Sequence, residues 1–158
     1  GVKVAPAGVT IQELIDDYCG GMKEDHIFKG YLPGGASGGI LPASMNNIPL
    51  DYGSKELTDA GCFLGSAAVV VLSDKDSMKD VALNLLKFFE EESCGQCTPC
   101  RVGTEKTVKL MKEKMWNKEK LADLSEVMSQ ASICGLGQAA TNPLNSVLKY
   151  FGNEISYE

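Results

Sequence analysis

The chain has one histidine, His26, one tryptophan, Trp116, and fewer basic than acidic residues, 15 against 21, for a net charge of −6. His26 has no acidic or cysteine partner at ligand spacing, which argues against a His-dependent triad and indicates a surface position. The scattered Lys and Arg residues would not attract a phosphate backbone. These scarcities speak against nucleic acid as a partner.

Long hydrophobic runs are also missing. The longest, residues 67–72, falls far short of the roughly 20 residues that span a bilayer, so we expect no membrane segment. Residues 1–10 lack an initiating Met, a basic start and an apolar stretch, so they do not resemble a signal peptide and suggest a cut edge. The hydrophobic content of 44% makes disulfides unnecessary, which favours a reducing, cytoplasmic setting.

The glycine-rich run at residues 34–39 lacks the features of a phosphate-binding loop. No Lys-Ser or Lys-Thr pair follows it, and no helix pattern opens directly after it. We interpret it as a structural turn.

The first part of the chain shows a mixed pattern. Thr10 can cap a short helix with Ile11, Leu14, Ile15 and Tyr18 on one face. Short apolar pieces broken by Gly and Pro predict strands of a small mixed sheet, at residues 2–5, 27–32, 39–41 and 62–72.

From Ser77 onward the apolar period becomes helical. Four amphipathic helices are predicted, beginning at the caps Ser77, Thr98, Asn117 and Asn142. The side chains expected to face inward are Met78, Val81, Leu85, Phe88, Phe89, Val108, Met111, Met115, Leu121, Leu124, Val127, Met128, Ala131, Leu144, Val147, Leu148 and Phe151. Such helices should pack as a small bundle. Trp116 is expected in the same core. The fold class is α+β, with one domain at residues 1–74 and a second at 75–158.

Cys94, Cys97 and Cys100 form a C-x2-C-x2-C triplet between the first two predicted helices. Three thiolates at this spacing can hold three corners of an iron-sulfur cube, whereas tetrahedral zinc is usually held by two separated pairs. In bacterial ferredoxins a further cysteine follows after three residues and serves a second cluster, but here that position is Thr104. The triplet therefore predicts one 4Fe-4S cluster with a remote fourth ligand.

Three other cysteines could be that ligand, and Cys134 is the best candidate. It lies between the third and fourth predicted helices, before Gly135 and Gly137, which would let main-chain N–H groups approach the cluster. Cys19 and Cys62 are expected to be small buried hydrophobic residues. Cys94, Cys97, Cys100 and Cys134 are thus the predicted metal and cofactor ligands. No catalytic residue is predicted, because these thiolates are ligands rather than nucleophiles.

Two other classes of function stay open. In one, zinc at the cysteines only ties the ends of the bundle together. In the other, the first domain is a binding module for a ligand or a partner subunit. Arg101 could offset negative charge beside Cys100, and Lys106 could do so or lie on a solvated surface.

Residues 92–104, ESCGQCTPCRVGT, strongly resemble the cluster motif of the flavoprotein subunit of respiratory complex I and its relatives. Residues 132–138, SICGLGQ, resemble the segment that supplies the fourth cysteine in that family. Residues 32–42, LPGGASGGILP, look most like the beta subunit of NAD-dependent formate dehydrogenase. The resemblance covers essentially the whole chain.

The resemblance implies a partial ubiquitin-like β-grasp domain of the SLBB type, followed by a four-helix bundle that holds the 4Fe-4S cluster. FMN and NAD would bind to an N-terminal flavin domain of the same subunit, whose motif has no counterpart here, so this part alone should be inactive. The implied function is single-electron relay in an NAD-dependent oxidoreductase. Implied partners are a 2Fe-2S subunit and a molybdenum-containing subunit. A parent of the NADH-quinone oxidoreductase or NAD-reducing hydrogenase type is the alternative.

Overall fold

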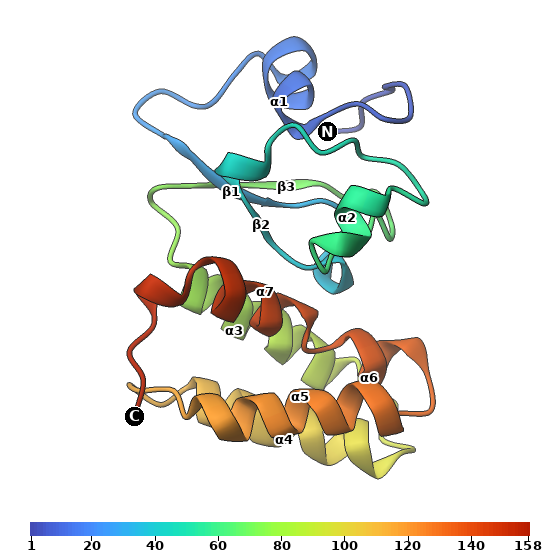
Figure 1. Cartoon of the computed structure of the whole chain (residues 1–158), viewed down its shortest axis with the longest axis vertical. Coiled ribbons are helices and arrows are strands. Elements are labelled where there is room, and N and C mark those ends of the chain that lie inside the picture. Colours follow the sequence, from blue (N-terminus) through green and yellow to red (C-terminus); the bar gives the residue numbers. More distant parts are fainter. The chain divides into compact units, whose positions relative to one another are not determined.

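The computed structural model describes residues 1–158, and the chain divides into two compact units, Gly1–Asp76 and Ser77–Glu158 (Figure 1). We call them the sheet unit and the helical unit. None of the helices combines the length and the apolar character that a membrane span requires. The fold is mixed α/β, with one small sheet and several helices.

The sheet unit contains three strands, β1 (Phe28–Leu32), β2 (Leu41–Pro42) and β3 (Val70–Ser73), in the order β2-β1-β3. Both pairings are antiparallel, so the expected mixed sheet is wrong. Tyr31 is fully buried and its hydroxyl donates to the carbonyl of Met45 at 2.9 Å. Burial raises the pKa of this phenol, so Tyr31 acts as a neutral part of the core.

Three strand predictions do not hold in detail. Of residues 39–41 only Leu41 lies in a strand, β2. Residues 2–5 form no strand, and Val2 and Val4 are 96% and 92% exposed. Within residues 62–72 only the end becomes a strand, where Val70 and Val71 are 45% and 39% exposed and Leu72 is buried. Apolar residues alone do not make a strand, because its backbone also needs a pairing partner.

The first helix begins at Thr10 as predicted. The Thr10 hydroxyl accepts a bond from the main chain of Glu13, and the Glu13 carboxylate accepts from Thr10 N at 2.8 Å, forming a capping box. Helix α1 (Ile11–Glu13) continues as the π-helical segment η1 (Leu14–Tyr18). Ile11 and Ile15 are the buried members of its predicted face.

The glycine-rich run is packed against backbone. It carries the short 3-10 helix η2 (Ala36–Gly38). A Cβ atom added to Gly34 would lie 1.7 Å from the carbonyl oxygen of Leu64, and one at Gly38 would lie 2.7 Å from that of Phe63. This close approach explains the glycines without a phosphate ligand. The remaining short elements are η3 (Ala43–Met45) and α2 (Lys55–Asp59).

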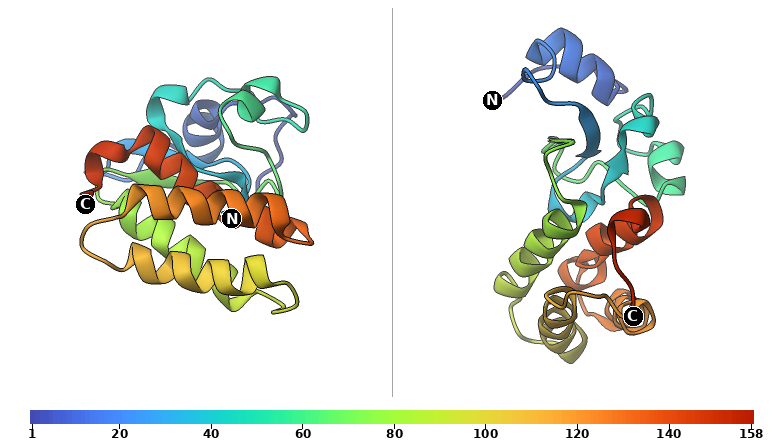
Figure 2. Two further views of the ribbon diagram at one scale, coloured as in Figure 1. Left: turned by 60° about the horizontal axis from the view of Figure 1, so that its bottom comes forward. Right: turned by 90° about the vertical axis from the view of Figure 1, so that its left-hand side faces the viewer.

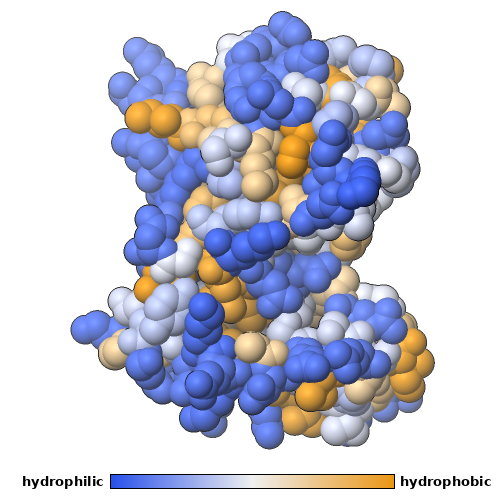
Figure 3. Space-filling view, viewed as in Figure 1, coloured by the Kyte–Doolittle hydropathy of each residue, from blue (hydrophilic) through white to orange (hydrophobic).

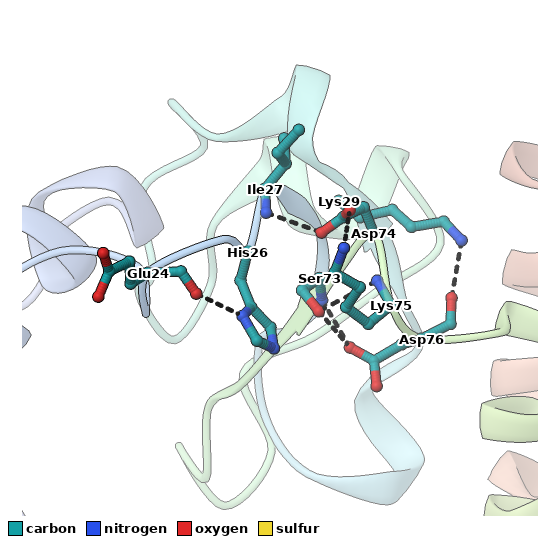
Figure 4. A network of polar contacts seen from close by, with 8 residues as sticks. All are labelled: Glu24, His26, Ile27, Lys29, Ser73, Asp74, Lys75 and Asp76. Atoms are coloured by element: carbon teal, nitrogen blue, oxygen red, sulfur yellow. Dashed lines mark hydrogen bonds and ion pairs between the residues drawn. The ribbon is translucent and has the colours of Figure 1, made fainter.

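Polar contacts tie the ends of β1 and β3 together (Figure 4). Ile27 N donates to the Asp74 carboxylate at 2.8 Å, and Lys29 Nζ donates to the carbonyl of Asp76 at 2.8 Å. The main-chain N–H of Ile27 holds the pKa of Asp74 below its usual value. His26 is half-buried rather than fully at the surface, and its Nδ1 lies 2.9 Å from the carbonyl oxygen of Glu24.

The helical unit contains α3 (Met78–Glu91), α4 (Thr98–Met111), α5 (Lys118–Ala131), α6 (Gly135–Ala139), α7 (Asn142–Tyr150) and η4 (Gly152–Glu154). Helix α3 packs against α4 and α7, α4 also packs against α5, and α6 contacts α4 and α5 (Figure 2). The fully buried Trp116 donates from Nε1 to the carbonyl of Met111 at 2.9 Å, which confirms its core position.

Two of the four predicted caps are confirmed. Ser77 and Asn117 accept main-chain hydrogen bonds at the starts of α3 and α5. At the other two helices the N-cap lies one residue earlier, at Cys97 and Thr141. In both cases a proline stands in the first turn, where its missing N–H costs no helical hydrogen bond.

The predicted apolar faces are partly wrong. Phe88, Met115 and Val127 are 46%, 43% and 52% exposed, although we expected them inside. The inward face of α5 instead includes Ser125, whose hydroxyl lies 2.7 Å from Thr141 Oγ1. A buried serine that finds such a partner is invisible to a pattern based on apolar residues.

Candidate metal centre

The cysteine triplet lies where the chain turns from α3 into α4. Cys94 is in the connection, Cys97 is the N-cap of α4 and Cys100 is in its first turn. Cys94 is exposed, Cys97 half-buried and Cys100 buried. The burial of the three cysteine side chains therefore increases along the sequence from Cys94 to Cys100.

Contacts within the connection hold its shape. Arg101 Nη1 donates to the carbonyl of Gly95, and its Nη2 lies 3.5 Å from Thr98 Oγ1. Gly95 has a φ of 74°, a left-handed conformation that favours glycine, and its N–H donates to Ser93 Oγ at 3.3 Å. Arg101 thus braces the loop that carries Cys94, a more specific role than the general charge compensation expected from the sequence. Lys106 is exposed.

A second segment of the helical unit, residues 132–137, meets this loop. Ser132 is the C-cap of α5 and Cys134 is the N-cap of α6. A Cβ atom added to Gly137 would lie 2.5 Å from Ser132 Oγ and 2.8 Å from Cys100 Cβ. Glycine at this position is therefore what lets the second segment approach Cys100.

The main chain around Cys97 favours its thiolate. The N–H of Ile133 is the largest contributor and that of Cys100 the second, and together they lower the pKa of the Cys97 thiol. The Ser132 hydroxyl adds a weaker effect of the same sign. Residues on both sides of Cys97 thus stabilise negative charge on its sulfur, as a metal ligand requires.

Two serine hydroxyls accompany the cysteines. Ser93 Oγ lies 3.4 Å from Cys100 Sγ. Ser132 Oγ is buried and makes no hydrogen bond of ordinary geometry. A buried hydroxyl without a partner calls for an explanation, and a redox group or ion bound beside it is one. The donor set of thiols, main-chain N–H groups and hydroxyls fits an iron-sulfur cluster.

The four predicted ligands are not all placed in contact. Cys97 and Cys100 meet the second segment directly, while Cys134 follows Ile133, whose N–H faces the Cys97 sulfur. No three Cys, His, Asp or Glu side chains stand close enough to hold a single metal ion. The four cysteines as one ligand set therefore stay a prediction.

The other cysteines and glycines give a mixed result. Cys62 is buried as expected, whereas Cys19 is exposed, so that expectation was wrong. Gly137 makes the close approach, but nothing lies within 4 Å of a Cβ added to Gly135. Sequence reasoning missed Ser93 and Ser132, although each stands one or two residues before a predicted cysteine ligand.

Apolar surface gathers at the end of the helical unit where α6 lies (Figure 3). Ile133, in the segment leading into α6, is 79% exposed. Two exposed cysteines, Cys94 and Cys134, belong to the segments that meet there.

Residues 80–158, half of the chain, match the family described as the NADH-ubiquinone oxidoreductase-F iron-sulfur binding region. The match includes all four predicted ligands.

Curated relatives match nearly the whole chain. An F-type component of the NADH-quinone oxidoreductase of Rhizobium meliloti is 34% identical over 98% of this chain and 38% of its own length. The HndC component of the NADP-reducing hydrogenase of Solidesulfovibrio fructosivorans is 34% identical over 98% of this chain and 32% of its own length. The chain thus spans about a third of the length of these relatives.

A solved structure shares the fold. The crystal structure of an NAD+-reducing [NiFe]-hydrogenase in the H2-reduced state superposes with a TM-score of 0.79 and 27% identity. The superposition covers 95% of this chain and 26% of that chain.

Proposed function

This chain belongs to the family of the NADH-ubiquinone oxidoreductase-F iron-sulfur binding region, and from that membership we propose that it relays electrons within an NAD-dependent oxidoreductase. One 4Fe-4S cluster, which the family binds, would take up and release single electrons here. The observation that carries the proposal is that the triplet and residues 132–137 come together in the helical unit.

In this proposal each part of the site has a defined task. Cys94, Cys97, Cys100 and Cys134 supply four thiolates. The N–H groups of Ile133 and Cys100 stabilise negative charge at Cys97, and Arg101 fixes the loop around Gly95. Exposed Cys94 and Cys134 would leave one side of the cluster near the surface, where electron exchange with a neighbouring centre is possible.

The finer assignment of the parent protein is also a proposal. The resemblance of residues 32–42 supports the beta subunit of a formate dehydrogenase, with a molybdenum-containing subunit and a 2Fe-2S subunit as partners. The relatives named above support the alternative, an NADH-quinone oxidoreductase or a hydrogenase. Both share an N-terminal flavin domain with FMN and NAD, and both are compatible with a cytoplasmic location.

We assign the sheet unit to an SLBB-type β-grasp domain and the helical unit to a four-helix cluster-binding domain. Three antiparallel strands in the order β2-β1-β3 support the first assignment, and the packing of α3, α4, α5 and α7 supports the second. Since the flavin motif has no counterpart in this sequence, the 158-residue chain alone should not reduce NAD. Diaphorase turnover by the purified chain would contradict this.

Anaerobic reconstitution of the whole chain with iron and sulfide tests the proposed function. The wild-type chain should bind about four iron and four sulfide and gain the visible absorption of a cluster. Cys97→Ser should lose both, whereas Cys19→Ser, which changes an exposed cysteine outside the helical unit, should retain both. One bound zinc without visible absorption would favour the structural alternative.

A specific observation favours a second role, recognition of a partner by the sheet unit. No strand pairs with the outer edge of β3, whose Val71 lines a cavity of about 1030 Å³ together with Val69, Ile15 and Leu50. An extended peptide could add to such an edge through main-chain hydrogen bonds. Slower amide exchange at residues 70–73 in the chain assembled with its partner subunits than in the chain alone would support it. Unchanged exchange would refute it.

A further inference from the structure

The feature that the proposed function leaves unexplained is the hydroxyl of Ser132. It is the buried side-chain oxygen that lacks a hydrogen-bond partner, and Ser132 is only 5% exposed. Its main chain is satisfied: the N–H donates to the carbonyl of Met128 at 3.2 Å, and the carbonyl accepts from Gln138 Nε2 at 3.0 Å. Only the hydroxyl remains, and burying it without a partner is destabilising.

The surroundings of this hydroxyl are those of the cysteine site. The hydroxyl lies next to Gly137. Cβ of Cys100 lies next to Gly137 as well, because a Cβ atom added to this glycine would contact both. The Ser132 hydroxyl is also among the groups that lower the pKa of the Cys97 thiol, after the N–H groups of Ile133 and Cys100. Ser125 in α5 shows the contrast, because that buried hydroxyl has oxygen partners at 2.7 and 3.0 Å.

We infer that the Ser132 hydroxyl donates a hydrogen bond to the sulfur of Cys97 when the cluster is bound, and that it thereby raises the reduction potential of the cluster. This inference rests on the proposed function. A serine O–H can rotate toward an acceptor without moving the backbone. The reduced cluster carries one more negative charge than the oxidised one, so a donor to its thiolate stabilises the reduced form more. Ser132 is then a positioning residue, and its hydroxyl tunes the reduction potential of the cluster.

The test is a potentiometric titration of the reconstituted chain, monitored by electron paramagnetic resonance. Ser132→Ala should bind the same amount of iron but show a more negative midpoint potential. We expect about a tenfold fall in the ratio of reduced to oxidised cluster at a fixed potential, which is about 59 mV for one electron. Ser132→Thr retains a hydroxyl and should restore a value near that of the wild type.

Ser125→Ala is the matched control. It removes a buried serine hydroxyl from α5, the helix that Ser132 caps, and this hydroxyl bonds to Thr141 and Asn145 instead of facing the cysteines. It should lower the thermal stability of the chain and leave the midpoint potential unchanged. An equal shift in Ser125→Ala would show that the potential responds to general loosening and would overturn the inference.

The remaining outcomes separate this inference from the proposed function. A wild-type chain that binds no cluster would refute the proposed function itself. A cluster with the same potential in wild type and Ser132→Ala would refute only the role of Ser132. Ser132→Gly removes the same hydroxyl, so its potential can be measured instead if Ser132→Ala binds iron poorly. Loss of the cluster from both would overturn the inference, because Ser132 would then be needed for binding instead of tuning.

Discussion

The two units treat their cysteines differently. In the sheet unit, Cys19 is exposed and Cys62 is buried, and neither has a second cysteine near it in sequence. In the helical unit, main-chain N–H groups from two segments stabilise the thiolate of Cys97, and Gly137 packs closely against Cys100. All six thiols are chemically identical, so the surrounding backbone is what distinguishes a cysteine suited to be a ligand from one that is not.

Trp116→Ala should produce the largest difference in stability between the two units. The side chain is fully buried and bonds to the carbonyl of Met111, so its loss should cost about 3–5 kcal/mol. Hydrogen exchange followed by mass spectrometry should show faster exchange across α4 and α5 with little change in β1. Equal destabilisation of both units would show that they do not fold separately.

Gly137→Ala should have the next largest effect. The added Cβ would meet Ser132 Cβ at 2.6 Å and Cys100 Cβ at 2.8 Å, and neither is the free end of a flexible side chain. We expect about 1–3 kcal/mol of destabilisation and a sharp fall in bound iron. Gly135→Ala is the matched control, because nothing lies within 4 Å of the added atom. Equal iron content in the two variants would contradict the packing account.

Thr10→Ala should affect only the sheet unit. It removes the hydroxyl that accepts from Glu13 N, a cap worth about 1 kcal/mol. Exchange should quicken in α1, while the iron content and the potential of the cluster stay unchanged. A loss of iron would mean that the sheet unit supports the cluster site.

The smallest expected effect is a dependence of the stability of α1 on pH, caused by the Glu13 carboxylate. Main-chain and side-chain hydrogen bonds from Thr10 hold the pKa of Glu13 below its usual value of 4.5. This stabilisation is present above the ordinary pKa and is lost as the pH falls through the lowered one. The protection of the α1 amides, measured against an unstructured peptide at the same pH, should therefore fall between neutral and strongly acid pH, and less so in Glu13→Gln. The same pH response in both proteins would rule out this carboxylate as the cause.

Prediction from the sequence succeeded where the signals were local. The caps Ser77 and Asn117 and the buried Met78, Leu121 and Leu144 follow from residues within a few positions of each other. Strand pairing depends on distant segments, which is why residues 2–5 and the sheet type were predicted wrongly. The exposure of Phe88 has the same origin, since the neighbouring helix, and not the period alone, decides which side of α3 is covered.

Only part of the candidate site could be predicted from the sequence. The spacing of Cys94, Cys97 and Cys100 is enough to predict them as ligands. The role of Ser132 depends on the fold placing Gly137 against it, and no spacing rule contains that contact. A hydroxyl residue beside a ligand cysteine therefore becomes a candidate only once the fold is known.

The most direct test of the account is iron and sulfide analysis, with Mössbauer spectroscopy, of the reconstituted wild-type chain, Cys134→Ala and Cys19→Ala. If sulfurs from two segments of the helical unit hold one cluster, the wild type and Cys19→Ala should each contain about four iron in a single four-iron cluster. Cys134→Ala should lose that species. A Cys134→Ala chain with the full iron content and an unchanged spectrum would contradict the account.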